Sequence, residues 1–371
     1  MLKFLILNWK DLRHPQHGGA EIATHYLARE WIKLGASVTI FSSETYPLPR
    51  EEIIEGVEIT RRGNALFSHF LWSPIYYYQK WKNTFDCVIE EIHGIPFFTP
   101  LYVTQCKFAL IFETGSQIWE KNIPFPFNYL GASLEKLARP LYREVIFFTT
   151  NPETKNELQG YGIKRVHLFP LAPTLLPPRN LQAKEKDPTF IFLGRLVPHK
   201  QIEDILKAFV LLRQNDELSP RLWIVGRGEK KYRKKLENLV QLLQLQKQVR
   251  FWGYVSEEKK YELLQRAWAL IVTSIKEGWG LNISEAGICG TTAIVYPNPG
   301  LTQNIINGKN GIITNNATPY SLSCALKKLI LYPSLKDELG LKNQQYQQQY
   351  SWKSSAQKLW DIIIATLHSS T

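Results

Sequence analysis

Short apolar segments alternate with helix-like segments along most of the chain. In the first half, the apolar runs Leu2–Leu7 and Val38–Phe41 flank Glu21–Leu34, whose apolar residues recur at helical spacing. The same alternation begins again at Thr189–Leu193 and continues past Thr292–Val295. Strands that alternate with helices form βαβ units on a parallel sheet. The sequence therefore predicts an α/β fold built from such units.

A proline-rich stretch, residues 171–188, separates two series of this kind. The length of 371 residues also suits about two domains. We therefore predict a first Rossmann-like domain over residues 1–172, a linker over 173–188 and a second Rossmann-like domain over 189–350. Residues 351–371 hold a final amphipathic helix. Two doubly wound domains joined in this way face each other across a cleft, and ligands bind at the carboxyl ends of their strands.

Cysteine usage and hydropathy bear on the compartment. Four cysteines are scattered without a CxxC pair or a metal-ligand spacing, which is typical of reduced thiols in a cytosolic protein. Residues 1–9 form too short an apolar run for a signal peptide, and residues 94–112 contain two prolines and a lysine. The sequence thus predicts a cytoplasmic protein without a metal site, at most peripheral at the inner face of a membrane.

The net charge of +12 is concentrated in the second half of the chain. Residues 1–180 carry 19 basic and 17 acidic side chains, whereas the remainder carries 26 and 16. A basic half attracts nucleotide phosphates or an anionic membrane surface. Its densest run, residues 227–235, is more typical of a solvated helix face. No nucleic-acid-binding motif accompanies it, so nucleic acid is not an expected partner.

Residues 277–285 (Glu-Gly-Trp-Gly-Leu-Asn-Ile-Ser-Glu) lie between an expected strand and a helix expected from Ser284. Two glycines let the backbone approach a ligand closely, and the N–H groups that begin a helix seat an anionic diphosphate. The flanking carboxylates, Glu277 and Glu285, can accept hydrogen bonds from sugar or ribose hydroxyls. The alternative is a plain strand–loop–helix joint with solvated glutamates.

Two further loops follow expected strands. Residues 17–21 (His-Gly-Gly-Ala-Glu) open a helix with paired glycines, a turn that favours anions but differs from the GxGxxG fingerprint. Residues 194–200 (Gly-Arg-Leu-Val-Pro-His-Lys) place Arg195 and Lys200 beyond a strand end. Cations there can neutralise charge on a departing phosphate, although an exposed loop would carry the same residues.

In their order and spacing, these three loops resemble the family 4 glycosyltransferases, which are retaining enzymes of the GT-B fold. The similarity includes the turn at 225–228, Pro299-Gly300-Leu301 and the Asn-Gly-Lys-Asn-Gly segment at 307–311. The resemblance implies a nucleotide-sugar donor held by the second domain and an acceptor, a saccharide or a lipid-linked sugar, held by the first. It also implies that no metal or other cofactor is needed, and that the helix at 351–367 returns to the first domain.

The resemblance assigns a role to individual residues. Arg195 and Lys200 would contact the donor diphosphate, Glu277 would hold the transferred sugar, and Glu285 would bind the ribose hydroxyls. The remaining donor-binding positions are backbone or small apolar positions in the loops: Gly18, Gly19, Gly194, Gly280 and Leu281.

Other positions depart from the family pattern. A histidine that commonly meets the acceptor is replaced by Phe112 and Glu113, the family's Pro-Asn-Gly reads Pro-Leu-Ala at 170–172, and Gln303 stands where an acidic residue is usual. Glu113 and His93 are therefore the acceptor-site candidates, and His93 is also consistent with a structural role.

Three functions remain open at this point. The first is transfer of a sugar from a UDP- or GDP-type donor, as in cell-envelope polysaccharide or glycolipid synthesis. The second is nucleotide-sugar 2-epimerisation on a similar two-domain architecture. The third is a catalytically degenerate subunit that only binds nucleotide sugar.

Overall fold

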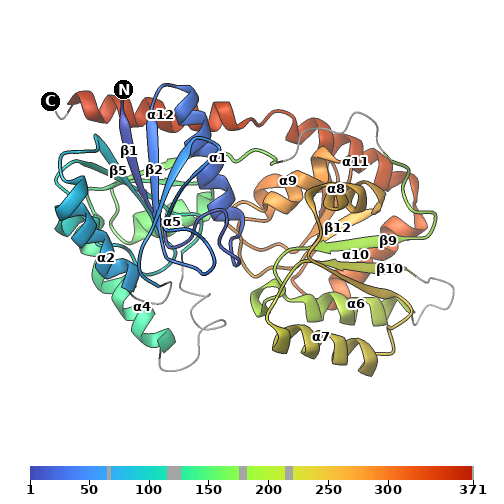
Figure 1. Ribbon diagram of the computed structural model, residues 1–371. Helices are drawn as coiled ribbons and strands as arrows, with labels where there is room; N and C mark the ends of the chain where they lie inside the picture. The colour runs from blue at the N-terminus through green and yellow to red at the C-terminus, as the bar shows by residue number, and fades with distance from the viewer. Residues whose placement is uncertain (65–67, 115–126, 175–181, 214–219, 370–371) are drawn as a thin grey trace. The chain divides into compact units, whose positions relative to one another are not determined.

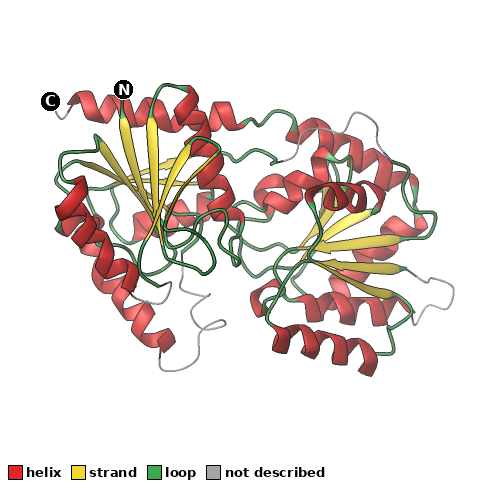
Figure 2. Cartoon of the chain, in the orientation of Figure 1, coloured by secondary structure: helices red, strands yellow, loops and turns green. Residues whose placement is uncertain are grey.

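The computed structural model describes residues 1–64, 68–114, 127–174, 182–213 and 220–369. The chain divides into two compact units, residues 1–171 with 351–371 and residues 172–350. Each unit is an α/β layer structure, in which helices cover a central sheet (Figures 1 and 2). The predicted α/β class with two doubly wound sheets is thereby confirmed.

The first unit is built on an eight-stranded sheet in the order β3-β4-β2-β1-β5-β6-β7-β8. All neighbouring strands pair in parallel except β3 and β4, which are antiparallel. The strands are β1 (Lys3–Leu7), β2 (Ser37–Ser42), β3 (Glu51–Ile54), β4 (Val57–Arg61), β5 (Cys87–Glu91), β6 (Cys106–Leu110), β7 (Ile146–Thr149) and β8 (Arg165–Leu168). The central strands β1, β5, β6 and β7 are largely buried, and most of their residues are apolar, but β5 ends in two buried glutamates.

Helices of the first unit connect these strands. They are α1 (Gly19–Lys33), α2 (Ser68–Tyr76), the π-helical turn η1 (Tyr77–Trp81), η2 (Thr99–Leu101), α4 (Phe127–Ala138), η3 (Arg139–Tyr142), α5 (Pro152–Gly160) and α12 (Trp352–Ser369). Among the described helices of the chain, none is long and apolar enough to cross a membrane.

The C-terminal helix α12 belongs to the first unit, as the resemblance implied. The Trp31 indole of α1 donates a hydrogen bond to the Ala356 carbonyl over 3.1 Å, and Tyr26 stacks on Trp352. Ser355 donates to the Pro170 carbonyl over 2.7 Å. These contacts bury the apolar face that the sequence pattern left without a partner.

The second unit is built on a fully parallel six-stranded sheet in the order β11-β10-β9-β12-β13-β14. Its strands are β9 (Thr189–Leu193), β10 (Arg221–Val225), β11 (Val249–Gly253), β12 (Ala269–Val272), β13 (Thr292–Val295) and β14 (Gly311–Ile313). Its helices are η4 (Pro198–Lys200), α6 (Ile202–Arg213), α7 (Lys230–Leu242), α8 (Glu257–Arg266), α9 (Leu281–Ile288), η5 (Thr302–Asn304), α10 (Pro319–Leu331) and α11 (Ser334–Gln347). One apolar core fills the space between this sheet and its helices.

Several predicted boundaries differ from the structure. Helix α9 begins at Leu281 instead of Ser284, because Gly280 adopts a left-handed conformation (φ 78°) and serves as its N-cap. Strand β6 ends at Leu110, although the apolar run continues to Phe112 and predicts a strand to that residue. Part of the expected linker packs within the second unit, since Lys184 donates hydrogen bonds to Ala267 and Thr291.

Candidate functional site

The loops that follow β9, β10 and β12 meet at the carboxyl edge of the second sheet. The Leu196 amide donates to the Arg227 carbonyl over 2.6 Å, which ties the β9 loop to the β10 loop. The Ile275 amide donates to the His199 carbonyl over 3.0 Å, which ties the β12 loop to the β9 loop. Two of the three predicted loops, 194–200 and 277–285, are thus brought together by backbone hydrogen bonds.

Glycine is required where the first two of these loops touch. A Cβ atom on Gly226 would lie 1.8 Å from the carbonyl oxygen of Gly194, and Gly226 also has a φ of 139°. A Cβ atom on Gly228 would lie 2.4 Å from the Leu196 carbonyl oxygen. Larger residues would therefore push the β9 and β10 loops apart.

Lys200 and Glu277 form an ion pair in this cluster. Both side chains are largely buried, and the Ser274 hydroxyl donates to the same Glu277 oxygen over 2.6 Å. Burial alone would raise the pKa of Glu277, but the Lys200 ammonium group and the Ser274 hydroxyl outweigh it and lower the pKa. These two residues therefore contact each other, whereas the resemblance had assigned them to different parts of the donor.

Glu285 lies one helical turn into α9 and is buried. Its carboxylate accepts hydrogen bonds from the Thr174 hydroxyl and, over 2.8 Å, from the Lys260 ammonium group. Burial would lower the pKa of Lys260, but the Glu285 and Glu257 carboxylates raise it. Glu285 is therefore held in one orientation as a charged acceptor.

The N-terminus of α9 lies beside these carboxylates in sequence and in space. Gly280 caps the helix and Leu281 is its first residue, and the Asn282 amide nitrogen Nδ2 donates to the Leu193 carbonyl over 2.9 Å. That bond fixes the helix start against the end of β9. Because the first N–H groups of a helix lack intrahelical partners, this end can seat an anionic group.

Arg195 differs from Lys200 in being exposed. Among the described residues, it forms no hydrogen bond or ion pair in this structure. An extended guanidinium beside Gly194 can turn toward an incoming phosphate without first breaking another contact.

The first unit carries a second polar cluster at the carboxyl edge of its own sheet. Glu91, at the end of β5, accepts hydrogen bonds from Asn8 over 2.6 Å and from Thr24 of α1, and its other oxygen bonds the His93 ring nitrogen Nε2 over 2.8 Å. Burial would lower the pKa of His93, but the carboxylates of Glu91 and Glu21 raise it. His93 is therefore held by a buried carboxylate at a position where ligands of parallel sheets bind.

The predicted glycine loop of the first unit adjoins this cluster. Gly18 is the N-cap of α1 and Gly19 its first residue, and the Gly18 amide donates to the Glu21 carboxylate over 2.6 Å. Burial would raise the pKa of Glu21, but His93 and Lys10 lower it. The Glu21 carboxylate occupies the helix N-terminus, so an anion would have to share that position with a charge of the same sign.

Glu113, the other acceptor candidate, lies three residues beyond the end of β6 and is partly buried. The residues from 115 to 126 lie outside the described part of the chain, so the structure does not define what faces it from there. Gln303, which replaces an acidic residue, donates from its amide to the Gly278 carbonyl over 2.9 Å and so braces the 277–285 loop.

Sequence reasoning missed several residues that complete these clusters. Lys260, Thr174 and Ser274 contact the two predicted glutamates, and Glu91 holds His93. Only Glu91 had a usable signal, a carboxylate at the end of an apolar strand. Among the described residues, no group of three or more His, Cys, Asp or Glu is placed to hold a metal ion.

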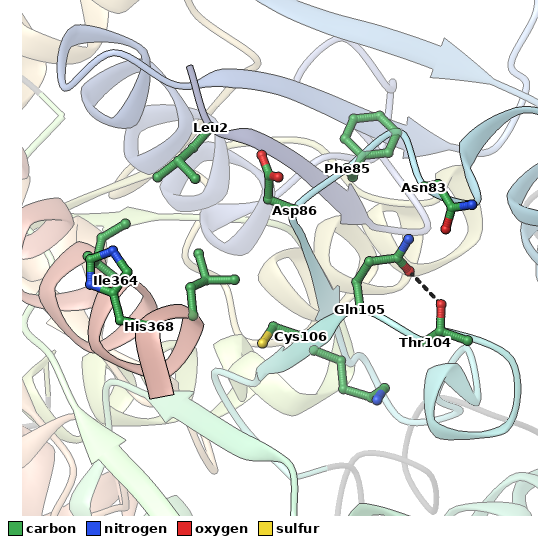
Figure 3. A pocket seen from close by; sticks show the side chains of 11 residues that line it. Leu2, Asn83, Phe85, Asp86, Thr104, Gln105, Cys106, Ile364 and His368 are labelled. Carbon is green, nitrogen blue, oxygen red and sulfur yellow. Dashed lines mark hydrogen bonds between the residues drawn. The ribbon is translucent and has the colours of Figure 1, made fainter. Parts of the chain in front are cut away.

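A cavity of about 730 Å³ lies elsewhere in the first unit. Figure 3 shows its lining, which includes Leu2, Asp86 and Cys106 at the amino ends of β1, β5 and β6, and His368 from the end of α12. Ligands of parallel sheets bind at the opposite, carboxyl edge. This cavity is therefore separate from the clusters described above.

Comparison with known proteins agrees with this geometry. Residues 178–347 match the family described as glycosyl transferases group 1. The putative glycosyltransferase EpsD of Bacillus subtilis is 25% identical over 219 residues, which are 58% of this chain and 56% of that relative. The chain therefore aligns with just over half the length of EpsD. The family match includes two of the three loops on which the resemblance rests, residues 194–200 and 277–285, and supports the resemblance to glycosyltransferases there.

Solved structures extend the likeness of fold over the whole chain. Sucrose-phosphate synthase from Thermosynechococcus elongatus matches with a TM-score of 0.82 and 17% identity, covering 100% of both chains. Alr3699/HepE from Anabaena, in complex with UDP-glucose, matches with a TM-score of 0.74 and 15% identity, also over 100% of both chains. At these identities the likeness concerns the fold, which is of the GT-B type.

Proposed function

We propose that this protein transfers a sugar from a nucleoside diphosphate donor to a saccharide or lipid-linked acceptor, because residues 178–347 match the glycosyl transferases group 1. The donor is of the UDP or GDP type, and the anomeric configuration is retained. The observation that carries the proposal is the cluster formed by Lys200, Glu277, Glu285 and the start of α9 at one sheet edge.

The donor is proposed to bind in the second unit. The diphosphate binds at the N-terminus of α9 and pairs with the cations Arg195 and Lys200. The ribose hydroxyls donate hydrogen bonds to Glu285. Binding draws Lys200 toward phosphate and frees a Glu277 oxygen for a sugar hydroxyl. The Ser274 hydroxyl keeps the Glu277 side chain in place during that exchange. The likeness of fold to HepE, which was crystallised with UDP-glucose, supports this class of donor.

The bond between the sugar's anomeric carbon and the diphosphate breaks as the nucleoside diphosphate leaves. Negative charge then grows on the leaving phosphate, and fixed cations and helix N–H groups stabilise it without reorganisation. We propose that these groups suffice without a divalent metal. The acceptor oxygen forms the new bond to the same carbon, and its proton passes to the departing diphosphate.

The acceptor is proposed to bind in the first unit, near His93 and Glu113. The His93 ring is fixed by Glu91 and stacks near Trp9 with 5.6 Å between the ring centroids. An imidazole held by a carboxylate, with an aromatic ring beside it, can orient a sugar hydroxyl. The role of Glu113 rests on its place beyond β6 alone.

The two alternatives predict different products. A 2-epimerase would convert or hydrolyse nucleotide sugar without any acceptor, whereas a degenerate subunit would bind it without turnover. The Lys200–Glu277 pair, with Arg195 beside it, favours transfer, because an enzyme that moves a sugar must stabilise a departing diphosphate.

The experiment that tests the proposal is incubation of the full-length protein with a panel of UDP- and GDP-sugars and with saccharide and lipid-linked acceptors. Mass spectrometry of the acceptor and nuclear magnetic resonance of the new linkage identify the product. We expect one donor to give an acceptor heavier by one sugar, with the anomeric configuration of the donor. Turnover of donor in the absence of acceptor, with an altered sugar as product, would support the epimerase instead. Binding without turnover for every pair would support the degenerate subunit.

A further inference from the structure

The helical stretch formed by α2 and η1 exposes large apolar side chains to solvent. Leu71, Trp72, Ile75 and Tyr78 are all exposed, and they recur at the spacing of one helix face. The opposite side of the stretch is already buried, through Tyr77 and other residues, in the core of the first unit. The exposed face is thus not explained by packing within the unit.

A second helical stretch, α4 with η3, repeats the pattern. Its exposed large apolar side chains are Tyr129, Leu130, Leu137 and Leu141, and Leu137 is 75% exposed. Scattered single apolar residues are ordinary on a protein surface, but eight of them on two neighbouring helical stretches form a patch.

Buried hydrogen bonds place the two stretches next to each other. The Ser73 hydroxyl of α2 bonds the Tyr102 hydroxyl, just after η2. At the other end of η2, Thr99 shares the Glu90 carboxylate with Tyr142 of η3. Figure 1 shows α2 and α4 in the first unit, and the link between the two stretches is the one that these hydrogen bonds make through η2. Between them, η2 adds Leu101, which is also exposed.

The charge around this patch is basic. Residues 68–82 contain Lys80 and Lys82 but no acidic residue. In α4 and η3, the single acidic residue, Glu135, pairs with Arg139. The acidic side chain beside Trp72 is Glu44, which is itself paired with Arg50. The patch therefore offers apolar side chains with Lys80 and Lys82 at its rim, which lie over Tyr76 and Tyr78 and form no ion pair with any described residue.

We propose that this patch, defined by α2, η1, η2, α4 and η3, is a docking surface for an anionic phospholipid bilayer. Trp and Tyr favour the membrane–water interface, and helices with an exposed apolar face lie within it. Lysines near such a face bind anionic headgroups. A protein partner fits less well, because lysine is depleted at protein–protein interfaces.

This surface lies on a different part of the chain from the one that composition indicated. The basic excess belongs to residues 181–371, whereas residues 1–180 carry a net charge of only +2 from 19 basic and 17 acidic side chains. The first unit binds lipid because apolar and basic side chains coincide on one surface. If the proposed transfer also holds, docking on this surface favours a lipid-linked acceptor over a free saccharide. That preference rests on the proposed function.

Vesicle flotation of the full-length protein tests the proposal and needs no nucleotide sugar, so it is independent of the proposed transfer. We expect the protein to float with phosphatidylcholine vesicles that contain phosphatidylglycerol, and to bind pure phosphatidylcholine more weakly. The double variant Trp72→Ser/Tyr78→Ser should bind at least about tenfold more weakly, since each side chain loses apolar burial. Lys80→Gln/Lys82→Gln should lose roughly tenfold on anionic vesicles alone.

Two matched controls come from exposed residues of the second unit. Leu242→Ser/Tyr320→Ser removes apolar side chains that are even more exposed than Trp72 and Tyr78, and Lys231→Gln/Lys234→Gln removes charge from the basic run. Both controls should bind vesicles as the wild type does, and thermal melts should show all variants folded. The proposal is overturned if the wild type does not float, or if patch and control variants bind equally. It is also overturned if the patch instead mediates a dimer that Trp72→Ser/Tyr78→Ser dissociates.

Discussion

The Lys200 ammonium group donates a hydrogen bond to the Glu277 carboxylate, although 77 positions separate the two residues in the chain. The contact joins the loop after β9 to the loop after β12. Each side chain compensates the charge of the other. Under the proposed function, donor binding exchanges this pair for contacts with phosphate and sugar, and the cost of that exchange can be measured.

We predict that Lys200→Met has two separable effects. It should lower the unfolding free energy by about 1–3 kcal/mol, because Glu277 keeps a charge that has lost its partner. It should also lower turnover about 10²–10³-fold. In the double variant Lys200→Met/Glu277→Gln, denaturant unfolding should show stability recovered while turnover stays low. Recovery of turnover together with stability would mean that the pair is only structural.

Replacement of Glu285 with Gln should weaken donor binding about tenfold or more, because a hydrogen bond to a charged acceptor is lost. Isothermal titration calorimetry with a donor analogue whose ribose lacks one hydroxyl can distinguish the loss of this hydrogen bond from a general loss of folded protein. The wild type should bind that analogue more weakly than the parent donor, and Glu285→Gln should discriminate less between them. If both proteins discriminate equally between the two ligands, Glu285 does not bind the ribose hydroxyls.

Gly226→Ala should disrupt the contact between the β9 and β10 loops. The added Cβ atom would meet the Gly194 carbonyl oxygen at 1.8 Å, so one backbone has to move. We expect a lower melting temperature and loss of donor affinity. Gly160→Ala is the matched control, because its Cβ atom would meet nothing within 4 Å. If Gly226→Ala has the same melting temperature and donor affinity as this control, the close approach of Gly226 to the Gly194 carbonyl is contradicted.

The stability of the first unit should depend on the protonation of His93. Its pKa is raised in the folded state above its ordinary value of 6.5, because the Glu91 carboxylate outweighs burial. The folded state then binds the proton more tightly than the unfolded state does. The stabilisation is fully present below pH 6.5 and disappears as the pH rises through the higher folded pKa. Urea unfolding from pH 5.5 to 9 should show this decline in the wild type and a smaller one in His93→Gln.

Periodicity predicted most elements of the fold, because local signals fix them. Helix α10 carries clear local signals, since Thr318 caps it and Pro319 occupies its first position. Strands β3, β8 and β14 were missed. Strand β3 carries exposed charge and pairs antiparallel at the sheet edge, β8 is a four-residue edge strand with one buried residue, and β14 has only three residues. Neither length nor alternation distinguishes such strands from loops.

The candidate site was predictable only as far as its loops. Glu277 and Glu285 stand out because glycines and a helix start separate them. The partners Lys260 and Thr174 lie 25 and 111 positions from Glu285, and no local pattern connects them to it. The contact between Lys200 and Glu277 likewise depends on two strand ends meeting, which only the folded sheet establishes.

The most direct test of the account is the rate of nucleoside diphosphate release from the cognate nucleotide sugar, with acceptor and EDTA present. It compares the wild type with Arg195→Ala and Arg143→Ala. Both arginines are exposed, so neither substitution should affect folding. The account predicts that the wild type and Arg143→Ala turn over equally in EDTA, and that Arg195→Ala is slower by about 10²–10³-fold at saturating donor. Equal rates for all three proteins would contradict a role for Arg195 in stabilising the leaving diphosphate. Loss of wild-type turnover in EDTA would contradict stabilisation without a metal.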